Sequence, residues 1–564
     1  MNVTRRNFIK TVGASGLVLA SHDLVSDLIA QTPAGNPLQS KFKGLADQVL
    51  AQAKAAGCTY ADIRFTRSAS MNVNASGNAG RGGQLAGARG GGGGRGGGGG
   101  RGGGGGRGGG GGFGGPQGFA AFGTGAGPRG PAGFGVRVIH SGVWGFSSSP
   151  IVTEDEIKRV TAVAIDVARA SAVAKTFDVR LAPVPAFSAH WKSPMRKDPT
   201  QVPQSDMQDY VQRVVDLVMK VPNVVSVNSS VSMGYDWRYF ASSEGSYIEQ
   251  EIYDTQPQFN VTARVGDETR SRQFTAVPKT AGWETAEESG MIENAERIAN
   301  EAVEYCTAKP IGMGVKDLIL SPSHAMLTIH EIIGHPTELD RVMGYEANYA
   351  GTSFIKVGDV GKLKYGSKLF NVTADRNMPG AMGTVGYDDD GVKTQSWPIV
   401  RDGILVGLQT NRETAHYLGE KESRGCTGAL SWRDYPFLRM PNVHVDYDPK
   451  GPSLEEIIAD TKDGVMIDGR GSYSIDQQRY NGQFGGNAFW EVKNGKITRM
   501  ATNVTYQAIT TDFWGNLDAV GNQSTWQMFG TGGDAKGQPT QTNSISHGSP
   551  WMRVSKILVG AAFS

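Results

Sequence analysis

Cysteine is scarce in this 564-residue chain, and its spacing excludes two classes of structural site. The three cysteines, Cys58, Cys306 and Cys426, are far apart, and none belongs to a C-x-x-C pair. Neither a disulfide framework nor a zinc ribbon is therefore expected. Net charge is also low, at +2, so bulk electrostatics favour no particular class of partner. A chain of this length can bury a large core and should fold as two or more domains.

The N-terminus lacks an apolar run long enough for a membrane helix. Residues 4–10 read T-R-R-N-F-I-K, a twin-arginine motif, and the weakly apolar residues 11–20 follow it at once. This segment is shorter than the roughly 20 residues that span a bilayer, and no cysteine follows it at a lipid-anchoring position. We expect residues 1–30 to be a twin-arginine signal peptide, cleaved near Ala30. The rest should be periplasmic or secreted, with no stable membrane anchor.

Residues 77–132 form a Gly/Arg-rich block with almost no large side chain. Its arginines recur every six residues, at Arg89, Arg95, Arg101 and Arg107. Such a block has little surface to bury and much backbone entropy to lose, so we expect a disordered insertion. Arg-Gly repeats can also bind RNA by following phosphates and stacking on bases. Aromatic residues are sparse here and an exported protein rarely meets RNA, so nucleic-acid binding is the less favoured alternative.

The chemistry of the chain centres on residues 330–335, H-E-I-I-G-H, which follow an apolar run. Neutral imidazole is a common zinc ligand, and a glutamate beside the first histidine is well placed to take a proton from a metal-activated water. This pattern indicates a metallopeptidase with His330 and His335 as metal ligands and Glu331 as general base. Two unrelated histidines beside a helix end are the alternative.

The spacing of the two histidines requires an irregular helix. In H-E-x-x-H the histidines are four residues apart and share one face, but here they are five residues apart. On a regular helix that separation turns them about 140° from each other. Gly334 and Pro336 favour a break in the helix. We therefore expect a helix over residues 323–333, a locally wide turn, and a new start through Glu338 and Asp340.

Around this motif the chain resembles the TldD/PmbA family of metallopeptidases, whose catalytic members carry H-E-x-x-x-H. Further segments are similar to family segments: Y-A-D-I-R-F at 60–65, G-F-G-V-R-V at 133–138, G-V-W-G-F at 142–146, R-M-P-N at 439–442 and G-Q-P at 537–539. The resemblance covers roughly residues 40–564, interrupted by the Gly/Arg-rich block. In the family this place lies between two strands joined by a turn, which implies that the block expands a hairpin tip.

The family resemblance implies a zinc ion held by both motif histidines and by a cysteine near the C-terminus. Here Asp534 stands where the family pattern C-G-K-G-Q-P has its cysteine, and Ser549 replaces a second family cysteine in H-G-S-P. A carboxylate can bind zinc, so Asp534 is the expected third ligand. His547 is an alternative third ligand, and a weakly held or absent metal is another alternative. A set of two histidines and one carboxylate also suits Fe(II). Iron ranks second to zinc because Glu331 has a hydrolytic role and no evident oxygenase role.

Two further acidic features accompany the motif. Glu338 lies three residues after His335 and is placed to orient that imidazole through its second nitrogen; an ordinary acid in the first turn of a helix is the alternative. Residues 388–390 read D-D-D before Gly391, but they lack the alternating spacing and the closing glutamate of a calcium loop. A solvated turn is the favoured interpretation of this acidic run.

The remaining pattern predicts an α+β fold, with an N-terminal α/β domain that holds an antiparallel sheet, a β-rich C-terminal domain, and the motif helix at the junction. Helices are expected at residues 41–56, 153–172, 205–220 and 285–305, and strands at 224–235, 238–242, 248–253 and 258–265. Turns are expected at Asp402-Gly403 and Asn494-Gly495. We place the N-terminal domain at residues 38–310 and the C-terminal domain at residues 311–564.

These observations predict an exported, zinc-dependent metallopeptidase that hydrolyses small or unstructured peptides. The family resemblance further implies that an extended peptide pairs with a sheet edge. It also implies a homodimer, or a heterodimer with a TldE/PmbA-like subunit in which this motif-bearing chain is the active half. Two alternatives stay open: a catalytically inactive TldD-like scaffold, favoured by the missing cysteine, and a nucleic-acid binder that acts through its Arg-Gly block.

Overall fold

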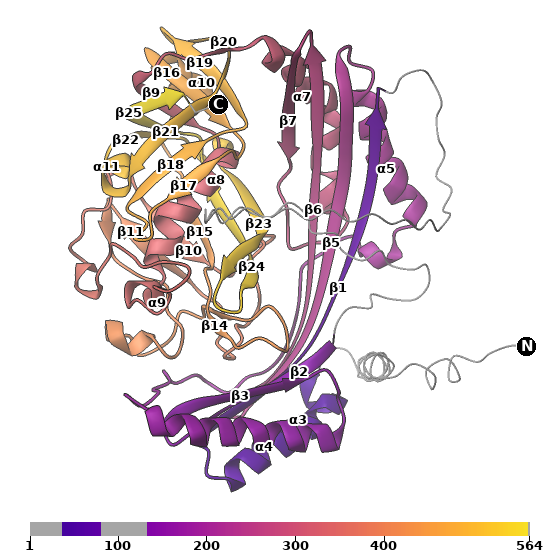
Figure 1. The fold of residues 1–564 in the computed structure, drawn as a ribbon, viewed down its shortest axis with the longest axis vertical. Coiled ribbons are helices and arrows are strands. Elements are labelled where there is room, and N and C mark those ends of the chain that lie inside the picture. The colour runs from indigo at the N-terminus through magenta and orange to yellow at the C-terminus, as the bar shows by residue number, and fades with distance from the viewer. Residues whose placement is uncertain (1–35, 80–131, 562–564) are drawn as a thin grey trace, which may run out of the picture.

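The computed structural model describes residues 36–79 and 132–561. The expected signal peptide and most of the Gly/Arg-rich block lie outside these residues. Long N-terminal strands stand on one side of the molecule and a compact set of C-terminal strands on the other (Figure 1). The fold is mixed α and β, as the sequence predicts, and the motif helix lies where the two parts meet.

The N-terminal part is built on a seven-stranded sheet with the order β3-β2-β1-β5-β6-β4, in which β7 also pairs with β6. Its strands pair antiparallel, except that β4 runs parallel to β6. The bounds are β1 Tyr60–Asn78, β2 Ala132–His140, β3 Val143–Ser149, β4 Ser188–Lys192, β5 Val224–Ser242, β6 Tyr247–Val265 and β7 Glu268–Thr275. The hairpin of β2 and β3 contains the two glycine-rich segments that resemble the family.

Two strands of this sheet are longer than the sequence pattern predicts. Residues 224–242 and 247–265 each form one strand, β5 and β6, where the pattern predicts four shorter strands. Pro257 interrupts the pattern but not β6, because pairing with β4 ends at Glu251 and pairing with β7 begins at Gln258. The strand therefore has an open side at Pro257, where a missing N–H costs no ladder hydrogen bond.

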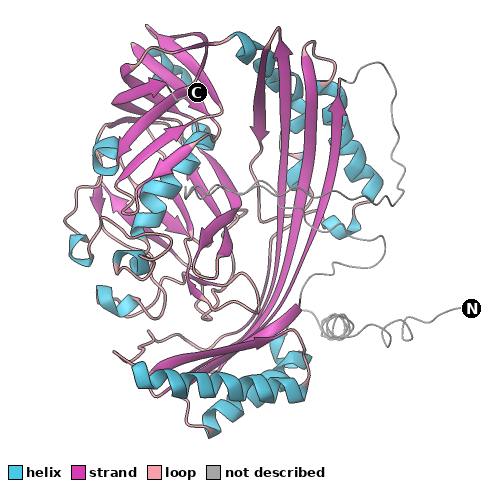
Figure 2. Ribbon diagram, viewed as in Figure 1, coloured by secondary structure: helices cyan, strands magenta, loops and turns pink. Residues whose placement is uncertain are grey.

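Two pairs of helices cover one face of this sheet (Figure 2). α3 (Lys41–Ala55) and α4 (Glu154–Ser171) cover one end, and α5 (Gln204–Val218) and α7 (Met291–Thr307) cover the other. The strand residues beneath them alternate, as in Ile63, Phe65 and Val73 of β1, which are all buried. Alternation along strands of this length therefore builds one continuous apolar face for four amphipathic helices.

The helix predicted over residues 285–305 is interrupted. A short helix, α6 (Glu284–Glu287), ends before Gly290, and α7 begins directly after it. Gly290 has a φ of 74°, a left-handed conformation that glycine adopts without steric cost. The apolar spacing continues across this break, which is why the pattern alone predicts a single helix.

The opposite face of the sheet is polar and faces the C-terminal part. Arg64 on β1 and Arg238 on β5 form ion pairs with Asp389 at 3.5 and 3.2 Å. Arg137 on β2 donates to Asp390 Oδ1 at 2.8 Å. The solvated turn predicted for residues 388–390 is therefore wrong: these carboxylates are buried. For Asp389 and Asp390 this burial is offset by guanidinium groups from strands far away in the sequence, and Asp388 accepts hydrogen bonds from backbone amides.

The C-terminal part contains a ten-stranded sheet, in the order β17-β18-β21-β25-β9-β16-β19-β20-β8 with β22 paired to β25, and a four-stranded sheet, β12-β11-β10-β15. Two strand pairs, β13–β14 and β23–β24, accompany them. The strands are β8 Lys309–Pro310, β9 Gly314–Leu320, β10 Val372–Asp375, β11 Ser396–Arg401, β12 Ile404–Leu405, β13 Thr427–Gly428, β14 Phe437–Leu438, β15 Asn442–Val445, β16 Asp463–Asp468, β17 Tyr473–Ile475, β18 Asn481–Gly485, β19 Ala488–Lys493, β20 Lys496–Thr502, β21 Val504–Ile509, β22 Leu517–Val520, β23 Gln527–Lys536, β24 Gln541–Ser549 and β25 Met552–Ala561. The helices are α8 Pro322–Ile329, α9 Leu339–Val342, α10 Leu454–Ala459 and α11 Thr510–Gly515.

The two turns predicted in this part of the chain are confirmed, because adjacent residues determine each of them. Asp402-Gly403 joins β11 to β12 and Asn494-Gly495 joins β19 to β20, and all four residues have positive φ. Such dipeptides favour the turns that match the twist of a hairpin.

Within the described ranges, the helices are all too short or too polar to cross a membrane.

Gly145 allows α4 to lie directly on β3. A Cβ at this position would be 2.0 Å from the carbonyl oxygen of Ala164 and 2.7 Å from the amide nitrogen of Ala168. Because these are backbone atoms of a helix, Gly145→Ala should displace α4 and lower the free energy of unfolding by about 1–3 kcal/mol. Thermal unfolding of the full chain measures this effect.

Gly44→Ala in α3 is the matched control for Gly145→Ala. Nothing lies within 4 Å of a Cβ at Gly44, and alanine stabilises a helix interior by about 0.5–1 kcal/mol relative to glycine. The two substitutions should therefore move the unfolding midpoint in opposite directions. An unchanged or raised midpoint for Gly145→Ala would contradict the close approach of α4 to β3.

Candidate metal centre

The metal motif begins on a short buried helix. Ser321 caps α8 by accepting a hydrogen bond from the amide of His324, and Pro322 occupies the first turn, where a missing N–H costs nothing. α8 then runs to Ile329 through residues that are almost entirely buried. It packs against β23 and β24, so strands near the C-terminus lie beside the motif (Figure 1).

The helix widens at His330. Residues His330–Gly334 form one π-helical turn, in which the amide of His335 donates to the carbonyl of His330. Because five residues now complete about one turn, the second histidine lies over the first instead of pointing away from it. The two ring centroids are 4.4 Å apart. The predicted wide turn is confirmed, although the α-helix ends at Ile329 and not at Ile333.

Side chains from outside the motif satisfy the carbonyl groups of this wide turn. Tyr365 Oη, Thr337 Oγ1 and Gln409 Nε2 donate to the carbonyl oxygens of residues 332, 333 and 334, at 2.8, 2.7 and 2.6 Å. Pro336 has no N–H to offer the preceding turn, and a buried carbonyl without a donor is costly. These hydrogen bonds therefore stabilise the irregular turn that brings the histidines together.

Asp534 reaches the two imidazoles from β23. Its Oδ1 is 3.7 Å from His330 Nε2 and 3.8 Å from His335 Nε2. Its Oδ2 and its backbone carbonyl accept hydrogen bonds from the guanidinium of Arg439. Oδ1 is buried, and no donor among the described residues reaches it. The pairing of β23 with β24 shifts register just before Asp534, as strands do where a side chain is redirected.

Hydrogen bonds fix which nitrogen of each motif histidine faces Asp534. His335 Nδ1 lies 2.9 Å from Glu338 Oε2, and since a carboxylate only accepts, Nδ1 carries the proton. His547 Nδ1 donates in the same way to a backbone carbonyl at 2.8 Å. His547 Nε2 therefore accepts from His330 Nδ1, 3.0 Å away. In both motif histidines Nε2 consequently directs a lone pair toward Asp534.

This arrangement fits a divalent cation. Burial lowers the pKa of His330 and of His547 to about 3 and holds that of His335 well below its ordinary value, so these rings are neutral. Two imidazole lone pairs and a carboxylate oxygen then share one buried space, where they repel each other unless a positive charge lies between them. Ligand atoms of His330, Glu331 and His335 all lie within 4.8 Å of one another. His547 contacts His330 at Nδ1, the ring nitrogen that does not face Asp534, so it does not reach this shared space.

Glu338 is the centre of a buried charge network behind His335. Its carboxylate accepts hydrogen bonds from His335 Nδ1, from Arg341 Nε and from Lys536 Nζ. Lys536 also donates to Asp340, and both side chains are buried. Burial alone would raise the pKa of Glu338, but the charges of Arg341 and Lys536 outweigh it and hold the pKa well below its ordinary value. The carboxylate therefore stays ionised and orients the imidazole.

The sequence pattern did not identify Arg341 or Lys536. Arg341 follows Glu338 by three residues, a spacing that places ion pairs on one helix face and would have indicated this pair. Lys536 stands two residues after Asp534 and matches the lysine of the family pattern C-G-K-G-Q-P, but that match assigns it no role. Its contact with Glu338 depends on the packing of β23 beside the motif, which has no local signal.

Glu331 lies at the same group and is almost fully buried, with 4% of the residue exposed. Arg479 Nη1 is 3.8 Å from its Oε2. Burial raises the pKa of Glu331 to about 7, against the lowering influence of Arg479 and Arg341. A carboxyl group with this pKa can both take and return a proton near neutral pH.

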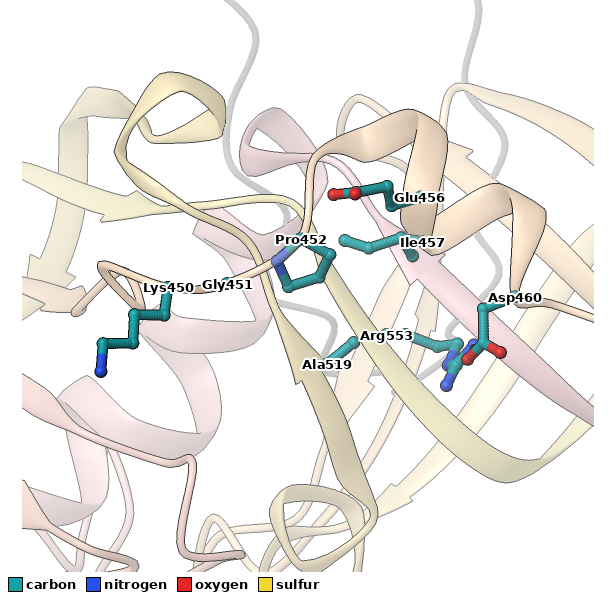
Figure 3. Close-up of a pocket in the computed structure, with 8 residues that line it drawn as sticks. All are labelled: Lys450, Gly451, Pro452, Glu456, Ile457, Asp460, Ala519 and Arg553. Carbon is teal, nitrogen blue, oxygen red and sulfur yellow. The ribbon is translucent and has the colours of Figure 1, made fainter.

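A cavity of about 500 Å³ lies elsewhere in the C-terminal part (Figure 3). Arg553 and Asp460 face each other in it and form an ion pair at 2.9 Å. Glu456, on another side, accepts a hydrogen bond from the amide of Ser453 and so caps α10. The charges of this cavity mainly serve the fold, so the histidine group is the stronger candidate for chemistry.

Models of the PmbA/TldA metallopeptidase domains match three stretches of the chain. Domain 1 matches residues 131–168, the central domain residues 197–307 and the C-terminal domain residues 314–561. Together these stretches cover most of the chain, and the last contains the whole histidine group. The chain belongs to the TldD/PmbA family. The resemblance that begins at H-E-I-I-G-H is thereby confirmed as a family relationship.

Several relatives of this TldD/PmbA protein are named metalloproteases. It is 28% identical to a metalloprotease of Methanocaldococcus jannaschii, over 68% of this chain and 82% of the relative. It is 22% identical to a zinc metalloprotease TldD homolog of Saccharolobus solfataricus, over 76% of this chain and 89% of the relative. TldE of Thermococcus kodakarensis shares the fold at a TM-score of 0.63 and 14% identity, over 91% of this chain and 99% of TldE. The relatives and the His–Glu–His group together support a metal cofactor.

Asp534→Asn should weaken metal binding by removing the charge that faces both imidazoles. The loss should exceed the roughly 10–100-fold that follows removal of an outer-shell partner. Asp534→Cys should retain the metal, because a thiolate is also a zinc ligand. Elemental analysis and zinc titration of the full chain measure both effects. Asp463→Asn, an acid on β16 paired with Lys316 and Lys493, is the control, and equal affinity in all variants would exclude Asp534 as a ligand.

Glu338→Gln should weaken metal binding about 10–100-fold, because the neutral amide holds His335 less firmly. It should also lower the unfolding midpoint, since Arg341 and Lys536 would lose a buried counter-charge. Competition with a chelator measures the first effect and thermal unfolding the second. Glu346→Gln tests whether any nearby acid has this influence, since Glu346 contacts the amide of Gly537. A metal affinity like that of the unaltered protein would contradict the role of Glu338.

Proposed function

We propose that the protein is a zinc-dependent metallopeptidase whose zinc is held by His330, His335 and Asp534. The observation that carries the proposal is the meeting of two Nε2 lone pairs with the buried Asp534 Oδ1, which accepts no hydrogen bond from the described residues. Two nitrogen ligands, one oxygen ligand and a position for water form a common catalytic zinc set. When bound, zinc supplies Lewis acidity, which lowers the pKa of water and polarises a carbonyl group.

Glu331 is the general base in this proposal. It follows His330 directly, and its carboxylate lies within the group of ligand atoms that the wide turn gathers. With a pKa of about 7, this carboxylate can take a proton from the attacking water and deliver it to the nitrogen of the departing amine. Arg479, 3.8 Å from Oε2, favours the ionised carboxylate that begins the reaction.

The proposed substrate is a small or unstructured peptide in an extended conformation. β23, which carries Asp534, pairs only with β24 among the strands of the described ranges. Its other edge therefore has no paired strand in the described ranges. An extended peptide can add to such an edge through main-chain hydrogen bonds, which give affinity with little sequence choice.

The proposal also includes export from the cytoplasm and assembly with a second subunit. The twin-arginine sequence at residues 4–10 supports export to the periplasm or beyond. The fold shared with TldE supports a homodimer or a heterodimer with a TldE/PmbA-like subunit. Because this chain carries both histidines and Glu331, it would be the active subunit of such a pair.

Glu331→Gln should slow turnover strongly and spare metal binding. It removes the base and leaves the three ligands in place, so kcat should fall by about 10²–10⁴. Cleavage of an unbiased peptide library by the zinc-replete full chain, with metal content measured on the same samples, checks both statements. Chelation of the unaltered protein should remove its activity, and added zinc should restore it.

Two results would count against this function. Equal cleavage by the unaltered protein and by Glu331→Gln would remove Glu331 from the general-base role. An unaltered protein that holds zinc but cleaves no peptide would favour the scaffold alternative, in which the subunit binds without turnover.

A further inference from the structure

Three neighbouring strands of the N-terminal sheet share a stretch without charge. Residues 69–78 of β1, 224–235 of β5 and 255–263 of β6 contain no Asp, Glu, Lys or Arg, although 20% of the whole chain is charged. These segments pair with one another along their length, so they lie side by side in the sheet.

The two faces of this uncharged region differ. Odd-numbered residues such as Val73 and Val231 are buried in the apolar core that the sheet shares with its helices. Side chains alternate along a strand, so the even-numbered residues point to the other face. At positions 70–78, 226–232 and 256–262 these even-numbered residues are all Asn, Gln, Ser or Thr. We call the surface that they form the neutral face.

A cavity of about 170 Å³ opens on the neutral face. Asn228 and Ser230 of β5, Gln258 and Asn260 of β6, and Gln273 of β7 contribute its polar side chains. The side chains of Asn228, Ser230 and Asn260 form no hydrogen bond with another described residue. Ser230 is only 8% exposed, and a polar group so deeply buried normally has a hydrogen-bond partner. The cavity therefore offers donors and acceptors to a molecule from outside the chain.

The neutral face meets β23 close to the metal group. A Cβ at Gly532 would be 3.7 Å from Gln256 Nε2, so the two strands approach each other there. Gly532 precedes the proposed ligand Asp534 by two residues, which is about 7 Å of strand. Asn260 lies four residues beyond Gln256 on β6, which adds about 14 Å. The path from the metal group to the cavity is therefore about 25 Å, which about seven residues of extended chain can span.

The chemistry of the neutral face selects the kind of ligand. A nucleic acid needs cations for its phosphates and aromatic rings for its bases, and the neutral face has neither. A charged side chain would lose water beside amides and hydroxyls that carry no counter-charge, which is costly. Peptide main chain and uncharged polar side chains both donate and accept hydrogen bonds, as do the side chains of this face. An uncharged polar peptide is therefore the ligand that this surface fits.

We propose that the neutral face is a second binding site for the peptide substrate and selects segments rich in uncharged polar residues. The inference rests on the proposed function, because one peptide would be cut at the metal group and continue past Gln256 to the cavity. A peptide of six residues is too short to occupy both places, whereas a peptide of twelve residues is long enough. The length and the charge of a substrate therefore both affect its affinity, although main-chain pairing at β23 makes little distinction between sequences.

Binding to a protein with strongly slowed turnover tests the second site directly. In the zinc-replete full chain carrying Glu331→Gln, calorimetry compares four N-acetylated, C-amidated peptides. These are Ala-Ser-Gln repeated four times, the same peptide with Glu or with Lys in place of each Gln, and Ala-Ser-Gln repeated twice. The neutral twelve-residue peptide should bind at least about tenfold more tightly than the other three, an advantage that roughly two net hydrogen bonds supply. The use of both charges separates a preference for neutral peptides from simple attraction or repulsion.

Substitutions at the cavity identify the groups responsible. Asn228→Ala together with Asn260→Ala should bring the affinity ratio of the neutral to the charged twelve-residue peptides close to one. Asn260→Asp should instead favour the Lys-containing peptide over the Glu-containing one, because a carboxylate at the cavity attracts a cation. Asn300→Ala is the matched control, since this exposed asparagine lies on α7, on the helix-covered side of the sheet, and should leave the ratio unchanged. The unfolding midpoint of each variant shows whether the fold is intact.

Equal binding of the three twelve-residue peptides by the protein with both asparagines in place would overturn the second site. So would a preference for the neutral peptide that survives Asn228→Ala and Asn260→Ala together. Hydrolysis of the same peptides by the unaltered protein reports separately on the proposed function. A protein that prefers the neutral peptide but cleaves none of them would disprove the peptidase and leave the second site standing. A protein that binds all three equally and cleaves them with equal kcat/KM would do the reverse.

Discussion

One extra residue in the helical turn after His330 is the constraint on which this site depends. A regular helix would point the two motif histidines apart by about 140°. The π-turn instead brings their rings to 4.4 Å, and it leaves carbonyl groups that Tyr365, Thr337 and Gln409 must satisfy. Those three side chains come from outside the turn, so the surrounding core stabilises a conformation that the six-residue motif would not hold alone.

Buried charge is balanced around the site by residues that come from different elements. Asp534 on β23 is matched by Arg439, and Glu338 is matched by Arg341 and by Lys536, which also lies on β23. The same strand therefore carries a candidate ligand and a counter-charge for the residue that orients His335. This arrangement makes the packing of β23 against α8 a condition for both parts of the site.

The sequence predicted fold elements well where close neighbours decide them. Asp402-Gly403 and Asn494-Gly495 form their turns because two adjacent residues accept positive φ. Prediction failed where distant residues decide. Asp389 and Asp390 are buried where arginines of the N-terminal sheet reach them, and β6 continues through Pro257 because its neighbours leave that side unpaired.

The sequence alone determined the motif, its need for a wide turn, and the i to i+3 approach of Glu338 to His335, because all of these act within a few residues of backbone. It also marked Asp534 by comparison with the family pattern, but not the contacts that Asp534 makes. Only the tertiary structure decided that Asp534, Lys536, His547 and Arg479 meet around residues 330–338. Such meetings depend on how sheets and helices stack, and residues that touch through stacking need share no periodicity in the chain.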